Sequence, residues 1–125
     1  MVNALSPRYM TDLMDIYRVV SALDGNITKL SRVLIAKAVP CRVYISERTD
    51  EKMEETAARV QYANKLTCAN TVDVQAGDEL VLARGANLPI PVIRAQQTFF
   101  AGVPVYYDQR LPHQEISIYR EARVS

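Results

Sequence analysis

The sequence predicts a mainly β protein, built as one small antiparallel β-barrel of about six to seven strands. Two observations carry this prediction. Runs rich in β-branched and aromatic residues recur along the chain and are separated by Gly, Asn and Pro, and apolar and polar residues alternate over 39–46. The chain has 125 residues, of which 49% are hydrophobic and 23% charged, so it can form one hydrophobic core.

The first two strands are predicted to form a hairpin. The run over 13–22 favours a strand, and it ends at Asp24-Gly25-Asn26, where Gly and Asn tolerate positive φ. The return strand over 27–45 is too long to stay straight, and Pro40 favours a bulge or a sheet edge within it. Residues 1–11 lack alternation, so we expect an extended N-terminal arm there, followed by a single domain over 12–125.

The end of the second strand is predicted to have one apolar face and one solvent-facing side. Val39, Cys41, Val43 and Ile45 are predicted to face the core, whereas the residues between them face solvent. Cys41 and Cys68 each lie inside an apolar run and not in a short-spaced pair, which argues against a zinc site. We expect two buried thiols, with a disulfide as the alternative.

The periodicity changes after residue 48. Thr49-Asp50-Glu51 offers an N-cap hydroxyl and two carboxylates, and apolar residues then recur at helical spacing up to Val60. This predicts one short helix or helical loop insertion over about 50–61. Its apolar face is narrow, so we expect the segment to be mobile until a partner holds it.

Short strands fill the remainder of the chain. Gly77 supplies a turn over 75–78, and Asp78 can accept hydrogen bonds from free backbone donors there. A Gly, Asn and Pro loop follows over 85–91, and a connector occupies 108–112. The strands are expected at 65–68, 72–74, 79–83, 91–98, 99–107 and 115–120.

The sequence offers no catalytic constellation. His113 and Glu115 could act as acid and base, but no second histidine or activated nucleophile completes a site, so we expect a surface-loop histidine that hydrogen-bonds locally. Asp73, Asp78 and Glu79 crowd one turn without the ligand spacing of a calcium loop, which favours turn capping. We therefore predict no enzymatic activity, no metal and no cofactor.

The charge balance argues against a general affinity for polyanions. The formal net charge is +1, so binding to nucleic acid would need a local patch. Lys29, Arg32, Lys37 and Arg42, with Tyr44 beside them, would suit an OB-type surface, although glutamates follow closely. The N-terminus lacks the pattern of a signal peptide and no run is long enough to span a bilayer, so no membrane partner is expected.

The order of several short motifs resembles a known family. The motifs are Met14-Asp15-Ile16-Tyr17-Arg18, Val39-Pro40-Cys41-Arg42-Val43, the turn from Val72 to Leu80 with Gly77-Asp78, and His113-x-Glu115. In this order and spacing, residues 12 to 120 look like the head-completion proteins of tailed bacteriophages, also called head-closure or stopper proteins.

The resemblance implies a structural protein of the virion neck, assembled in the host cytoplasm. Such proteins are small β-barrels that form homo-oligomeric rings, here of six or twelve subunits. The ring would join the portal or adaptor protein to a tail terminator or tail tube protein, and packaged DNA would pass through its lumen without sequence-specific binding. Two alternatives remain, a tail terminator or other neck protein, and a small OB-like or SH3-like nucleic-acid-binding module.

The resemblance also suggests site residues by position. The stretch Ser46–Tyr62 corresponds to a segment that projects toward the channel and can form its gate, with an ordinary solvated helix as the alternative. Its charged candidates are Arg48, Asp50, Glu51, Lys52, Glu54, Glu55 and Arg59. Candidates for contacts in the ring or with a partner are Phe100, Tyr106, Tyr107 and His113, although alternate aromatics of that run could belong to the core.

Overall fold

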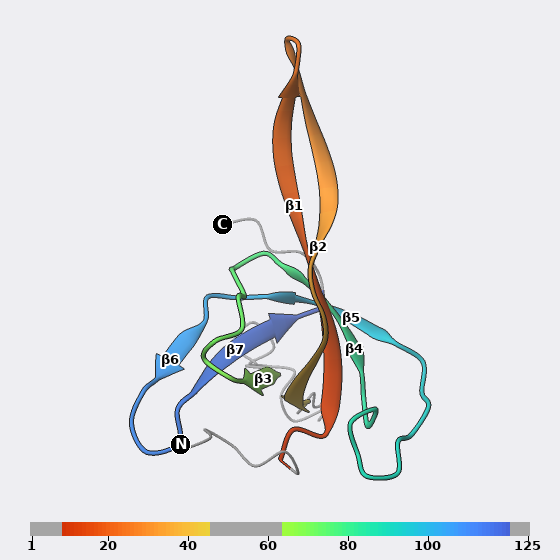
Figure 1. Ribbon diagram of the computed structural model, residues 1–125, viewed down its shortest axis with the longest axis vertical. Helices are drawn as coiled ribbons and strands as arrows, with labels where there is room; N and C mark the ends of the chain where they lie inside the picture. Colours follow the sequence, from red (N-terminus) through yellow and green to blue (C-terminus); the bar gives the residue numbers. More distant parts are fainter. Residues whose placement is uncertain (1–8, 46–63, 121–125) are drawn as a thin grey trace, which may run out of the picture.

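The computed structural model describes residues 9–45 and 64–120, and within them it contains seven strands in one antiparallel sheet and no helix (Figure 1). The strand order is β3-β2-β1-β4-β5-β7-β6, and β3 also pairs with β7. The predicted mainly β architecture is confirmed. The strands are β1 (Asp12–Asp24), β2 (Ile27–Tyr44), β3 (Lys65–Cys68), β4 (Glu79–Ala83), β5 (Gln97–Ala101), β6 (Val105–Tyr107) and β7 (His113–Tyr119).

The core collects the inward-facing residues of six strands. Side chains of a strand alternate between its two faces, and this alternation buries Cys41 and Val43 while Tyr44 stays exposed, as predicted. Val39 and Ile45 pack against the same cluster. The buried cluster consists of Met14, Ile16, Cys41, Val43, Leu66, Cys68, Val74, Leu80, Leu82, Phe99, Ala101, Ile116 and Ile118.

The predicted bend in the second strand is present. The register between β1 and β2 shifts on both sides of Ile16, so β2 carries two extra residues relative to β1. Ala38 has a positive φ of 55°, and its backbone N–H donates to Asp15 Oδ1 at 2.8 Å. Extra residues of this kind bend a strand and increase its twist. The bulges therefore redirect the part of the hairpin that follows them.

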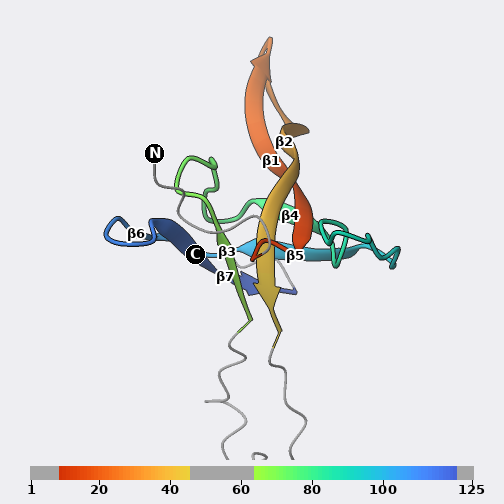
Figure 2. The ribbon, with the colours of Figure 1, turned by 60° about the horizontal axis from the view of Figure 1, so that its bottom comes forward.

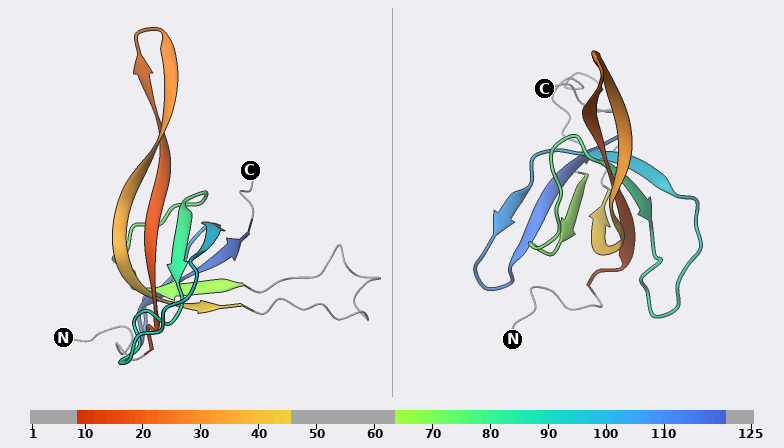
Figure 3. Two further views of the ribbon diagram at one scale, coloured as in Figure 1. Left: turned by 90° about the vertical axis from the view of Figure 1, so that its right-hand side faces the viewer. Right: turned by 45° about the horizontal axis from the view of Figure 1, so that its top comes forward.

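Beyond these bulges the hairpin extends past the sheet as a two-stranded ribbon (Figures 1 and 3). Strand β4 pairs with β1 only from Leu13 to Tyr17, and β3 pairs with β2 only from Arg42 to Tyr44. β2 is 18 residues long, whereas β3 and β4 have 4 and 5 residues. Strands this long cannot be covered by such short neighbours. The ribbon closes at Gly25, whose φ of 69° fits the predicted turn.

Two predicted strands differ from the structure. The strand predicted over 91–98 is wrong for residues 91–96, where Ile93 is 98% exposed, and its last two residues belong to β5. Pro89 and Pro91 lack backbone donors for a sheet ladder, so the apolar residues between and after them do not pair. Residues 72–74 belong to a turn region, because the Val72 N–H donates to the Ala69 carbonyl at 3.1 Å.

The predicted strand over 99–107 is divided into β5 and β6. Gly102 N–H donates to the Ser117 carbonyl at 2.7 Å, and a Cβ at Gly102 would lie 3.1 Å from that same oxygen. A side chain is therefore hard to accommodate at this break, and Pro104 removes a second donor. The last strand begins at His113, two residues earlier than predicted.

Parts of the prediction lie outside the described residues. These are the helix insertion over about 50–61 and residues 1–8 of the arm. Within the remaining piece of the predicted arm, Met10 is buried and its carbonyl accepts a 2.6 Å hydrogen bond from the Asn87 side chain. No membrane-spanning helix occurs in the part of the chain that the structure describes.

Candidate protein-binding site

The projecting hairpin has one face dominated by apolar side chains. Directly opposite residues of an antiparallel pair share a face, so Tyr17 with Leu34, Val19 with Arg32, Ser21 with Leu30 and Leu23 with Thr28 form this face. The exposed fractions of Leu23 and Leu30 are 76% and 71%. We define the hairpin patch as the four exposed aliphatic residues of this face, Val19, Leu23, Leu30 and Leu34.

The opposite face of the hairpin is more mixed. It carries Val20, Ile27 and Val33, which are also exposed. An ion pair of 2.9 Å between Lys29 Nζ and Asp24 Oδ2 interrupts them near the turn. Four exposed aliphatic residues therefore lie on the face of the hairpin patch, and three lie on the opposite face.

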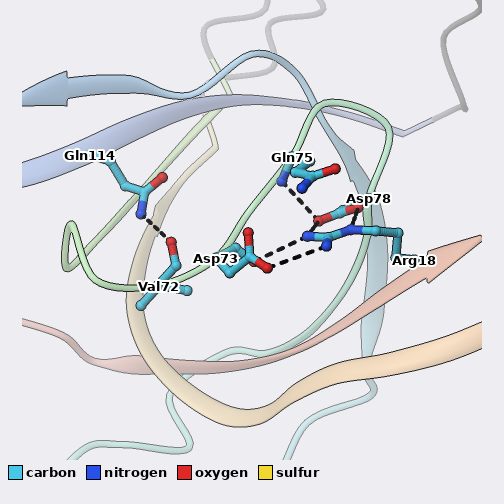
Figure 4. A network of polar contacts seen from close by, with 6 residues as sticks. All are labelled: Arg18, Val72, Asp73, Gln75, Asp78 and Gln114. Atoms are coloured by element: carbon cyan, nitrogen blue, oxygen red, sulfur yellow. Dashed lines mark hydrogen bonds and ion pairs between the residues drawn. The ribbon is translucent and has the colours of Figure 1, made fainter.

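Arg18 fastens the hairpin to the turn before β4 (Figure 4). Its Nε and Nη2 donate to the two carboxylate oxygens of Asp78 at 2.9 and 2.8 Å, and Nη1 reaches Asp73 Oδ2 at 3.3 Å. Asp78 is buried and also accepts the Gln75 N–H at 2.9 Å, as predicted for this turn. The hydrogen bonds to Asp78 raise the pKa of Arg18 above its ordinary value. A bidentate pair of this kind fixes both position and orientation.

Arg32 provides a second anchor on the other face of the hairpin. Its Nε and Nη2 donate to the Glu79 carboxylate at 2.9 and 3.0 Å, and the guanidinium lies 3.6 Å from the centroid of the Tyr17 ring. The hydrogen bond to Glu79 raises the pKa of Arg32. Because Arg18 and Arg32 act from opposite faces, the base of the ribbon is held from both sides.

A second exposed apolar surface follows the edge strand β6. We define the β6 patch as Val103, Val105, Tyr107 and Leu111, all exposed. Tyr106 is exposed too, but it shares the other face of β6 with Gln114, to which it is paired. Within the described residues, β6 pairs with β7 alone. The backbone of Tyr107 is held by Asn70, whose Nδ2 donates to the Tyr107 carbonyl at 3.1 Å.

His113 packs beside this patch. Its ring stacks on Tyr107 with the centroids 4.9 Å apart. Nδ1 lies 2.8 Å from the Leu111 carbonyl, and Nε2 lies 3.2 Å from Glu115 Oε2. The predicted local hydrogen bonding of His113 is confirmed, although the residue opens β7 and does not lie in a loop.

The structure separates the predicted interface residues into two places. Tyr106, Tyr107 and His113 lie together on β6 and the start of β7, and both tyrosines are exposed, so neither belongs to the core. Phe100 is half-buried on β5 and pairs with Tyr119 at the far end of β7. Phe100 is therefore not part of the same surface.

The predicted channel segment lies outside the described residues. This holds for its charged candidates Arg48, Asp50, Glu51, Lys52, Glu54, Glu55 and Arg59. The described residues on either side of the segment are adjacent, because Tyr44 of β2 pairs with Lys65 of β3. The segment therefore connects two strands that pair with each other.

The acidic turn and the cysteines have structural roles. Asp73 and Asp78 pair with Arg18, and Glu79 pairs with Arg32. Over the described ranges, no group of three His, Cys, Asp or Glu residues could hold a metal ion. Cys41 and Cys68 are buried free thiols, which confirms the favoured interpretation. Burial raises the pKa of Cys68 to about 12 and also raises that of Cys41.

The hairpin patch was not among the predicted site residues. Its signal in the sequence was the mismatch in length between the second strand, over 27–45, and the strands of four to five residues predicted at 65–68 and 79–83. Comparison of the chain with protein-family models, with curated proteins and with solved structures finds no match in any of the three.

Proposed function

We propose that this chain is a structural subunit of a phage head-to-tail connector, a homo-oligomeric ring that joins the portal or its adaptor to the tail and helps to retain packaged DNA. The observation that carries the proposal is the anchored hairpin. It presents four exposed aliphatic side chains beyond the sheet, where no described strand covers them. Large exposed apolar surfaces of this kind mark sites of protein association.

The strand pairing supports a stiff ring wall. Following the pairs from β1 through β2, β3, β7, β5 and β4 leads back to β1, while β6 continues along β7. This circuit favours a closed barrel, in which the paired strands leave few free edges. A closed wall suits a ring that must hold its shape around a channel.

Two of the motifs that carry the family resemblance meet at the base of the hairpin. Arg18 ends the first motif and Asp78 belongs to the Gly77-Asp78 turn, and the two form the bidentate pair at 2.8 and 2.9 Å. Arg18 and Asp78 are 60 positions apart in the sequence, and together they anchor the hairpin. This contact supports reading the motifs as one pattern, consistent with the proposed connector.

The nucleic-acid-binding alternative is less well supported by the contacts of the basic residues. Lys29 pairs with Asp24, Arg32 pairs with Glu79, and the Arg42 guanidinium lies over the rings of Tyr9 and Tyr44 at 4.7 and 5.3 Å. Cations engaged in this way are less available to phosphates. Strong binding of single-stranded DNA with a steep dependence on salt would favour this alternative.

The connector role is testable in phage whose gene for this chain carries an early stop codon. We expect DNA-filled heads and separate tails in the lysate, and we expect purified chain to restore tailed particles in vitro. Electron microscopy would count both kinds of particle. Normal tailed particles without the chain would contradict the proposal, and tails of abnormal length would instead favour a tail terminator.

A further inference from the structure

We propose that the hairpin patch of one copy of this chain packs on the β6 patch of the next copy, head to tail. The inference rests on the proposed function for the closure of the ring, but the contact itself follows from the two surfaces of the described residues. The occupant of the hairpin patch is thus a second copy of this chain.

The two patches lie on different parts of the molecule. The hairpin projects from one end of the sheet, whereas β6 lies at an edge of the body, and two views show them apart (Figures 1 and 2). A surface that binds its own equivalent closes a two-fold pair, whereas two different complementary surfaces build a ring or a filament. Contact between two hairpins would leave the β6 patch bare. A head-to-tail contact covers both patches in every subunit.

The exposed areas suit such a contact. From the exposed fractions of their residues, the hairpin patch and the β6 patch each offer about 400 Å² of mainly apolar surface. Roughly 60% of an interface is apolar, so these patches would form part of an interface of about 1,300 Å² in total, within the range of standard specific complexes.

Both surfaces are held in place before binding. Arg18 and Arg32 fasten the base of the hairpin, and the His113 stack together with Asn70 holds Tyr107. Surfaces ordered in advance lose less conformational entropy on association. The β6 patch contributes Tyr107, a type of residue that often anchors an interface, and the hairpin contributes aliphatic side chains that can pack against its ring.

Cysteine cross-linking tests the contact directly, since Cys41 and Cys68 are buried and leave introduced thiols as the reactive ones. Two full-length variants, Leu23→Cys and Val105→Cys, are mixed in concentrated solution under a mild oxidant. We expect the main disulfide-linked dimer to join position 23 of one chain to position 105 of another, as identified by mass spectrometry of its peptides. The matched control is Ala22→Cys, the exposed neighbour on the opposite face of the ribbon.

Each outcome decides the inference. A 23-to-105 yield several times that of the 22-to-105 mixture supports it. A dominant dimer of Leu23→Cys with itself overturns it in favour of contact between hairpins, and equal yields from the two mixtures overturn it as well. The connector role is decided by a different result. Normal particles from a phage that lacks the chain would contradict that role even if the purified protein gives the predicted cross-link.

Discussion

Removal of the Asp78 carboxylate is expected to destabilise the protein and release the base of the hairpin. In Asp78→Ala, Arg18 loses two hydrogen bonds and the Gln75 N–H loses its acceptor. Breaking a buried ion pair costs about 3–5 kcal/mol. Arg18 is 18% exposed and keeps Asp73, so we expect the lower end, about 3 kcal/mol.

Urea unfolding followed by circular dichroism measures this loss. With a slope of about 1.5 kcal/mol per M, the midpoint should fall by about 2 M. Asp73→Ala is the matched control, because it removes a carboxylate that contacts the same guanidinium but is 62% exposed, and we expect a loss of about 0.5 kcal/mol or less. Similar losses in the two variants, or a loss below about 1 kcal/mol in Asp78→Ala, would refute the anchor.

Three further predictions concern the buried thiols, the bulge and the connection between β2 and β3. Burial raises the pKa values of Cys41 and Cys68, so the unfolded chain loses these protons first as pH rises from about 9 toward 12. Stability should then fall by up to about 1.4 kcal/mol per pH unit for each thiol. Between pH 7.5 and 10, urea titrations should show a smaller fall in the free energy of unfolding for a variant with alanine at both positions than for the unchanged chain. An equal fall in the two proteins would contradict this prediction. Ala38→Gly should stabilise the fold by about 0.5–1 kcal/mol because Ala38 has a positive φ, whereas Ala22→Gly in regular strand should destabilise it by a similar amount. Thermal unfolding should show a higher melting temperature for Ala38→Gly and a lower one for Ala22→Gly. Deletion of residues 49–60 should leave the β2–β3 pairing and the cross-link intact while filled heads leak DNA, and unchanged DNA retention would exclude a gate in this segment.

The local structure was predictable where one short pattern determines it. The turn at Gly25 follows from residues that tolerate positive φ, and the burial of Cys41 and Val43 follows from strict alternation. The bulge near Ala38 follows from a strand too long to remain straight. These features depend on neighbours in sequence.

The features that depend on distant partners were not predictable. Arg18 and Asp78 lie 60 positions apart, and nothing local marks them as a pair. Ile93 belongs to an apolar run that predicts a strand, yet none of the described strands covers it and it is 98% exposed. Likewise, the exposure of the hairpin patch depends on which part of β1 pairs with β4, and the sequence does not state this.

The central claim is that the chain acts as one subunit of a ring around the DNA channel. Cryo-electron microscopy of the neck in particles that contain the chain tests it most directly. The account predicts a closed ring between portal and tail, with the hairpin of each subunit on the β6 patch of the next. Absence of the chain from the neck, or a neck in which its hairpins contact no neighbouring copy, would contradict the account.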